Sequence, residues 1–169
     1  MKNEGKGETA RLTLEDWILA FLEYADGEVR GKTRLQKALF LVQQEVGGVP
    51  AEFRPHKYGP YSADIDNALE RLAREGLVEV VEEPGGDESP VQVIRLRPEA
   101  RERARRALEA LKGHPEWGEA IQPAFELAAR RPLMALLAYI YTFYPEYTEN
   151  SLIKAKVRRW RKRRLLGLF

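Results

Sequence analysis

The sequence contains no cysteine, only two histidines and no long apolar run. Without cysteine the chain can form neither disulfides nor thiolate metal sites. The longest apolar segment, PLMALLAYIYTFYP, falls short of the roughly 20 residues that span a bilayer. The polar start, MKNEGKGETA, lacks the apolar core of a signal peptide. These absences lead us to expect a cytoplasmic protein with no membrane span.

Catalytic and metal-binding motifs are also missing. His56 and His114 both lie beside prolines and have no partner at metal-ligand spacing. The segments YADGE and PGGDESP lack the glycine spacing and the Lys-Ser/Thr pair of a phosphate-binding loop. Asp64 and Asp66 are two residues apart on an expected helix, so their side chains point apart and cannot share a proton. We therefore expect no enzyme activity, no metal and no cofactor.

Charge is distributed unevenly along the chain. The 28 basic and 26 acidic side chains leave a net charge of +2. Residues 151–169 hold eight Lys and Arg and no acidic residue, so residues 1–150 hold 20 basic and 26 acidic side chains and carry a net −6. An acidic body with a basic tail is the clearest indication of the partners. The preference for Arg over Lys and Glu over Asp is thermophile-like, although a GC-rich genome has the same effect.

Hydrophobic periodicity predicts three helices followed by a hairpin. TLEDWILAFLEYADG begins with a capping-box-like pair, Thr13 and Asp16, and GKTRLQKALFLVQQEVGG ends at two glycines. SADIDNALERLAREG begins at Ser62, which can cap it. LVEVVEE and VQVIRLR alternate apolar and polar residues around the turn-rich PGGDESP. This order is typical of a winged helix–turn–helix domain, which we place at 13–97 after a flexible start at 1–12.

The rest of the sequence predicts a helical extension at 98–150 and a basic C-terminal helix or tail at 151–169. A charged helix is expected from Pro98 to about Lys112, and a short one in AFELAARR. The apolar helix in PLMALLAYIYTFYP should pack on the first two helices, because alone it would expose Leu133 and Phe143 among others. Asn150 or Ser151 can cap the last helix. The expected fold class is mainly α with a small β-hairpin, that is, α+β.

Three segments carry a resemblance to a known family: KTRLQKALFLVQQE, FRPHKYGPYSADIDNALERLAREGLV and YIYTFYPEYTENSLIK. They resemble the SocA-like, or Panacea, antitoxin domains and the related YwgA-type proteins, over residues 13–83 and 132–154. The Tyr-Gly-Pro-aromatic-Ser block is the most specific part. The resemblance implies a winged-helix-like fold and, in many members, a toxin–antitoxin or phage-defence context in which the domain binds a partner protein. It implies no catalytic motif and no role for the basic tail.

The loop that leads into the third helix has two interpretations. The Gly-Pro pair in HKYGPYS favours a tight turn, and Tyr58 and Tyr61 can lie flat on the core. The loop would then only fix how the third helix enters the fold. Alternatively, Arg54, His56 and Lys57 present a small basic patch that holds a phosphate of a nucleic acid.

The third helix has the position of a DNA-reading helix but not its charge. Its exposed face is expected to hold four acidic and two basic side chains, and phosphates repel unpaired carboxylates. Asn67 and Arg71 can still read adenine and guanine, and they share a face with Arg74. However, Glu70 and Glu75 have the spacing that pairs with these arginines. The preceding link of about 13 residues also exceeds the three or four of a DNA-reading turn.

The basic tail is the second candidate surface. It is either a solvated helix end whose cations suit the helix dipole, or a surface for a nucleic acid, an acidic protein or an anionic membrane. Trp160 either packs with Ile153 and Val157 on the body or stacks on a base. The apolar end LLGLF is expected to dock on the chain's own core, a second copy or another protein. The predicted nucleic-acid-binding residues are Lys154, Lys156, Arg158, Arg159, Trp160, Arg161, Lys162, Arg163 and Arg164 of the tail and Asn67, Arg71 and Arg74 of the third helix.

Two functions of different classes follow from these features. The first is a non-enzymatic regulator of winged-helix type that binds DNA or RNA, for example in transcription regulation, with the tail supplying most of the affinity. The second is an antitoxin-like adaptor that binds a protein through the acidic face of the third helix. A homodimer through the C-terminal helices is compatible with both.

Overall fold

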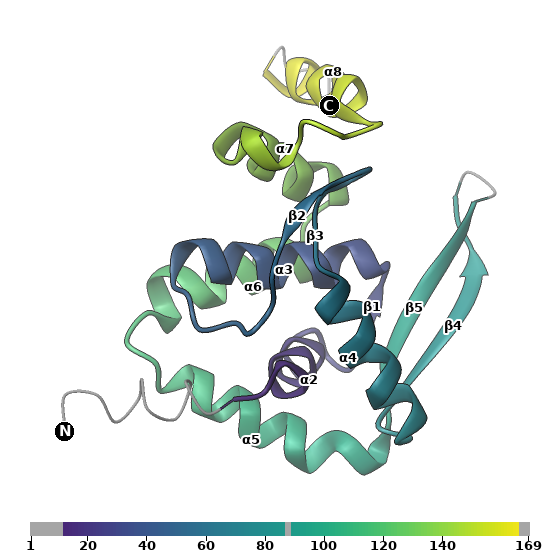
Figure 1. Ribbon diagram of the computed structural model, residues 1–169, viewed down its shortest axis with the longest axis vertical. Helices are drawn as coiled ribbons and strands as arrows, with labels where there is room; N and C mark the ends of the chain where they lie inside the picture. The colour runs from purple at the N-terminus through teal and green to yellow at the C-terminus, as the bar shows by residue number, and fades with distance from the viewer. Residues whose placement is uncertain (1–11, 87–88, 166–169) are drawn as a thin grey trace.

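The computed structural model of the chain describes residues 12–86 and 89–165, and it shows the mixed α and β fold that the sequence predicts (Figure 1). The predictions for residues 1–11 and 166–169 lie outside the described residues. In chain order, the elements are α2 (Leu14–Tyr24), β1 (Glu28–Arg30), α3 (Lys32–Glu45), β2 (Arg54–His56), β3 (Gly59–Tyr61), α4 (Ala63–Arg74), β4 (Val78–Pro84), β5 (Pro90–Leu96), η1 (Pro98–Ala100), α5 (Arg101–Lys112), η2 (Trp117–Ile121), α6 (Gln122–Arg130), α7 (Leu133–Phe143), η3 (Pro145–Tyr147) and α8 (Lys154–Leu165).

A three-stranded antiparallel sheet has the strand order β1-β5-β4. The predicted hairpin is confirmed, and its strands pair from Val78 with Leu96 at the base to Pro84 with Pro90 near the tip. The sequence does not predict β1, because three residues are too few to show an alternating pattern. This strand forms because Val29 is 3% exposed on the core and pairs with β5.

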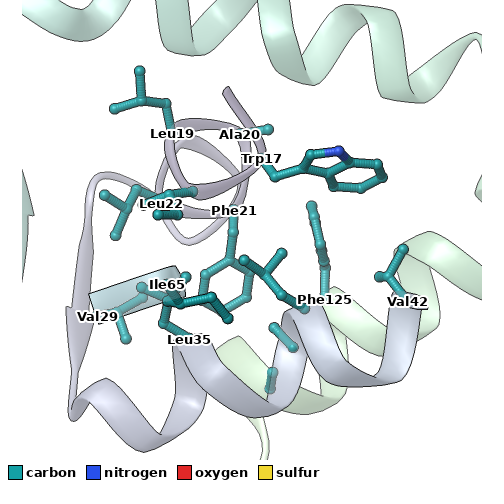
Figure 2. Packing of buried hydrophobic residues seen from close by; sticks show 14 of the residues in the cluster. Trp17, Leu19, Ala20, Phe21, Leu22, Val29, Leu35, Val42, Ile65 and Phe125 are labelled. Atoms are coloured by element: carbon teal, nitrogen blue, oxygen red, sulfur yellow. The ribbon is translucent and has the colours of Figure 1, made fainter. Parts of the chain in front are cut away.

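The hydrophobic core surrounds α2, which lies between α3 and α5 (Figure 1). Trp17 and Phe21 are fully buried, and the ring of Phe21 packs edge-on against Phe125 of α6 with the ring centroids 5.2 Å apart (Figure 2). Ala104 and Leu111 of α5 belong to the same buried cluster. The helices α5 and α6 therefore share one core with the helices before them.

The starts of α2 and α4 are stabilised in different ways. Thr13 and Asp16 form the predicted capping box, in which Asp16 N–H donates to Thr13 Oγ1 at 3.1 Å and Thr13 N–H donates to Asp16 Oδ2 at 3.1 Å. The prediction that the Ser62 side chain caps α4 is wrong, because it forms no capping bond. Instead, Ser62 N–H donates to Gln36 Oε1 at 2.8 Å, and Gln36 Nε2 donates to Ser62 O at 2.9 Å. A buried side chain of α3 thus holds the entrance to α4.

Substitution of Gln36 by leucine should lower the free energy of unfolding by roughly 1–3 kcal/mol, because the buried N–H of Ser62 then loses its acceptor. Urea denaturation measures the change. The matched control is Gln44→Leu, which alters an exposed glutamine of the same helix and should change stability by less than about 0.5 kcal/mol. Equal effects of the two substitutions would show that the bonds to Ser62 do not stabilise the fold.

The segment between α3 and α4 contains a second hairpin where the sequence predicts a loop. β2 and β3 are antiparallel, with Arg54 opposite Tyr61 and His56 opposite Gly59. The prolines in both strands hide the strand pattern in the sequence. Gly59 has a φ of +94°, which favours glycine, and a Cβ at this position would lie 3.2 Å from Cε1 of Tyr141. A tight turn is present, but Lys57 and Tyr58 form it directly before the Gly-Pro pair, which lies in β3.

The apolar helix α7 packs chiefly on α3, α6 and α8, so the prediction that it packs on the first two helices is correct for α3 only. Leu136 and Ile140 join the main core, whereas Leu137 faces α8. The expectation that α7 buries Leu133 and Phe143 is wrong, since these side chains are 36% and 63% exposed. The reason is that α5 and α6 already cover α2, which leaves α7 at the periphery (Figure 1).

Candidate nucleic-acid interface

The basic C-terminal segment forms α8, which docks on α7 (Figure 1). Val157 is 2% exposed and packs on Leu137 and Ala138 of α7. Ile153 and Trp160, about one turn before and after Val157, add partly buried contacts to the same cluster. This spacing gives α8 one narrow apolar face, as the sequence predicts, and leaves the rest of its surface to the charged side chains.

Trp160 packs on the body, which is the first of its two predicted roles. Its side chain is partly buried against the α7–α8 cluster. The guanidinium of Arg164 lies over the indole, 5.8 Å from the ring centroid, a position that a cation prefers on an aromatic face. Arg161 Nη1 donates to Thr142 Oγ1 of α7 at 2.5 Å, which adds a polar bond to the docking.

The cations of α8 point into solvent. All eight are exposed, and in the described part of the chain none of them forms an ion pair with a carboxylate within 4 Å. Several arginines of the body differ, because Arg30, Arg71, Arg95, Arg103 and Arg130 are each paired with an acidic side chain. The positive charge of α8 is therefore not neutralised within this part of the molecule.

The β2–β3 hairpin holds the segment that leads into α8. Leu152 N–H donates to Lys57 O in the hairpin turn at 2.8 Å. The hydroxyls of Ser151 and Tyr141 are hydrogen-bonded at 2.5 Å, and Ile153 N–H donates to Ser151 Oγ at 3.1 Å. The exposed basic side chains of this hairpin therefore lie at the same end of the molecule as α8 (Figure 1).

The predicted contact residues of α4 are exposed, but one of them is already engaged. Arg71 binds Glu15 of α2 through its Nε at 2.8 Å and its Nη2 at 2.6 Å. The prediction that helix-spaced glutamates of α4 pair with this arginine is therefore wrong, because packing of α2 beside α4 brings a better-placed carboxylate. Within the described residues, no hydrogen bond or ion pair holds the side chains of Asn67 and Arg74.

The two predicted sets of residues lie apart. Figure 1 places α8 at one end of the long axis, beyond α7, whereas α4 lies on the far side of α3 and next to the sheet. The structure thus brings the eight cations of α8 together but does not unite them with the residues of α4. One ligand would have to be long to reach both.

The β4–β5 hairpin carries no free arginine between Val78 and Leu96 in its described part. Arg95 binds Glu28 of β1 and Glu83 of β4, both at 2.5 Å, and Arg30 of β1 binds the same Glu83 at 2.6 Å. The hydrogen bonds from Arg30 and Arg95 lower the pKa of Glu83. Glu79 is exposed on the outer strand. In its described part, this hairpin therefore offers no unpaired arginine to a phosphate.

A small cavity of about 180 Å³ lies between α3 and the β2–β3 hairpin and was not predicted from the sequence. Lys37, in its wall, is only 3% exposed, and its Nζ donates to Pro60 O at 3.0 Å. Burial lowers the pKa of this amine to about 7. The lining consists of Lys32, Thr33, Gln36, Lys37, His56, Tyr58, Gly59, Tyr61 and Asp66.

Aromatic side chains form the hairpin side of this cavity. The ring of His56 stacks on Tyr61 with the centroids 4.6 Å apart. The Tyr61 hydroxyl donates to Asp66 Oδ2 at 2.7 Å, and this bond raises the pKa of Tyr61. Tyr58 is 49% exposed, so the expectation that both tyrosines of the segment lie flat on the core is wrong for Tyr58.

The pattern of α3 contained a signal for this cavity. The run from Ala38 to Val42, directly after Gln36 and Lys37, is apolar on all sides of the helix and is buried. A helix segment that is apolar all round is buried all round. The two polar residues that precede this run are buried with it, and an unexplained buried lysine indicates a functional or structural site.

Comparison with known proteins adds no family to these findings, since no protein-family model matches the chain and no curated protein matches it either. In residues 12–86 and 89–165, no group of three or more His, Asp or Glu is arranged to hold a metal ion. None of the helices in this part of the chain combines the length and the apolar character that a bilayer crossing requires.

Proposed function

We propose that the protein is a non-enzymatic nucleic-acid-binding regulator of the winged-helix type, in which α8 supplies most of the affinity. The observation that carries the proposal is the exposure of eight cations on α8 without a carboxylate partner in the described chain. Docking on α7 holds these charges on one ordered helix, so a phosphate backbone would relieve their repulsion without first ordering the segment.

The arrangement of the elements supports the winged-helix part of the proposal. The order is a helix, a short strand, two helices separated by the β2–β3 hairpin, and the longer β4–β5 hairpin, and the short strand pairs with this hairpin in the order β1-β5-β4. In this assignment α4 takes the position of the DNA-reading helix, where exposed Asn67 and Arg74 add selectivity. Arg71 contributes only if it leaves Glu15. The affinity therefore rests on α8, and α4 has a secondary role.

A second candidate is an antitoxin-like adaptor of the SocA-like type that binds a protein through the acidic face of α4. Asp64, Glu70 and Glu75 are exposed on this helix, and Glu15 neutralises Arg71 beside them. Such a face repels phosphates and suits a basic protein surface. A homodimer remains compatible with either function.

A binding titration at several salt concentrations tests the proposal. Duplex DNA, single-stranded DNA and structured RNA are each titrated with the full chain and with a chain that ends at Asn150. We expect the full chain to bind with a steep salt dependence and the shortened chain to lose most of the affinity and of the slope. Circular dichroism checks that the shortened chain is folded.

Two results would count against the proposal. Equal affinity of both chains would remove α8 from the interface. Absence of binding by the full chain, together with a stoichiometric protein partner that co-purifies with it, would favour the adaptor.

A further inference from the structure

The cavity beside α3 contains a buried cation without a counter-ion. The ammonium of Lys37 has three N–H donors, and Pro60 O at 3.0 Å accepts one of them. No carboxylate of the described residues lies within 4 Å of Nζ. Asp66 lines the same cavity, but its oxygens accept from Tyr61 at 2.7 Å and from Gln36 at 3.4 Å. A buried amine either loses its proton or is paired, and an anion from outside the chain would supply the pair that the described residues do not.

The surroundings of Lys37 favour an oxyanion with two negative charges. Lys32 lies on the same wall, one and a half turns earlier on α3, and adds a second cation. Thr33 offers a hydroxyl, and α3 begins without a side-chain cap, so the backbone N–H groups of Lys32 and Thr33, which line the cavity, have no side-chain acceptor, whereas Arg34 N–H donates to Gly31 O. Asp66 opposes an anion, but the bonds that it accepts disperse its charge. Two lysines and a helix N-terminus outweigh this one carboxylate.

The shape and position of the cavity limit the ligand. A volume of about 180 Å³ holds a small group, and the rings of His56, Tyr58 and Tyr61 provide flat walls for a ring attached to it. No residue of α8 lines the cavity. The hairpin turn that forms one side of it, however, is hydrogen-bonded to the segment that leads into α8.

We propose that this cavity is a binding site for a phosphate monoester, either free or as the terminal phosphate of a nucleic-acid strand, whose phosphate pairs with Lys37. The site is independent of the function assigned to α8, because it is built from α3, the β2–β3 hairpin and α4. Binding keeps Lys37 protonated and therefore takes up a proton under alkaline conditions. The other titratable groups that face the amine are Lys32, His56, Tyr58, Tyr61, Asp66 and Tyr141.

Titration calorimetry with phenyl phosphate and with inorganic phosphate tests the site. At about pH 8 the amine of Lys37 is largely neutral, so measurements in two buffers of different ionisation enthalpy should show an uptake approaching one proton. Lys37→Met should weaken binding by at least about tenfold and abolish the uptake. Thr33→Val, which leaves all charges in place, should weaken binding by a few-fold and keep the uptake, so the test does not depend on one variant. The control, Lys112→Met, removes an exposed lysine of α5 that does not line the cavity and should bind as the parent protein does.

The outcomes separate this site from α8. Absence of saturable binding, or binding that Lys37→Met leaves unchanged, overturns the proposal, and the latter result would place the phosphate outside the cavity. Oligonucleotides with a 5′-phosphate or a 5′-hydroxyl identify the source. If the strand with the 5′-phosphate binds more tightly and Lys37→Met removes this preference, the ligand is the end of a nucleic-acid strand. If the two strands bind equally while phenyl phosphate still binds, the ligand is a free phosphate monoester. If α8 binds no nucleic acid, phenyl phosphate still tests the cavity.

Discussion

Replacement of four cations of α8 by glutamine should weaken the binding of duplex DNA by at least about a hundredfold and reduce the slope of log affinity against log salt by about three to four. The variant carries Arg158→Gln, Arg159→Gln, Lys162→Gln and Arg163→Gln. Each phosphate contact releases condensed counterions and contributes about 0.9 to the slope. Glutamine has nearly the helix propensity of the residues that it replaces, and the docking residue Val157 is unchanged, so α8 should stay on α7.

A matched variant tests whether the affinity depends on the position of the cations on α8 or only on the net charge of the protein. Substitution of Arg101, Arg105, Arg106 and Lys112 by glutamine removes four exposed cations of α5, on the opposite side of the core from α3 (Figure 1). The net charge falls by the same four units, yet the affinity should fall by less than about tenfold, because only long-range attraction is lost. Filter binding or fluorescence anisotropy measures both variants. If the α5 variant loses as much affinity and slope as the α8 variant, net charge alone drives binding and α8 is not the interface.

Substitution of Lys37 by methionine should change the pH dependence of stability more than any other single lysine substitution that we consider. The folded protein holds this amine at a pKa of about 7 because of burial, whereas the ordinary value is 10.5. Between these values the unfolded chain binds a proton that the folded chain does not, so the free energy of unfolding rises with pH. The slope that Lys37 contributes is roughly 1.4 kcal/mol per pH unit. Below about pH 7 the amine is charged in both states, and its burial penalty is constant.

Urea denaturation of the parent protein and of Lys37→Met from about pH 6.5 to 10 measures this contribution. Methionine has similar length and no charge, so the variant lacks the slope, although Pro60 O loses its donor. Compared with the parent protein, the variant should therefore be most stable at neutral pH. The difference in free energy of unfolding between the two proteins should shift against the variant by several kcal/mol as the pH rises. Lys57→Met, at an exposed lysine of the adjoining hairpin, serves as the control. Parallel stability curves for Lys37→Met and the parent protein would mean that the amine is not buried in solution.

The helices and the long hairpin are the parts of the fold that local patterns predict well. The capping box of Thr13 and Asp16 and the apolar stripe of α2 mark that helix because both signals depend on residues within one or two turns. The β4–β5 hairpin is marked by alternation over seven residues in each strand around a turn-rich segment. The sequence does not predict the short strands. β1 and the β2–β3 hairpin have three residues per strand, and only pairing with a partner makes them strands.

The candidate surfaces also contain features that the sequence predicts and features that it does not. The charge of α8 and its apolar face of Ile153, Val157 and Trp160 are visible in the sequence, because they repeat along one helix. The engagement of Arg71 is not visible, since its partner Glu15 lies 56 residues away in the chain and reaches it only through the packing of α2 on α4.

The sequence by itself determined the helices and the long hairpin, the excess of positive charge in the last segment and the absence of thiol chemistry. It did so because propensity, periodicity and charge are properties of neighbouring residues. Only the tertiary structure decided that Gln36 and Lys37 are buried, that α8 docks on α7 with its cations outward, and that the residues of α4 and α8 lie apart. These features depend on which elements cover one another, and burial of a single amine beneath a hairpin is what turns an ordinary lysine into a candidate anion-binding group.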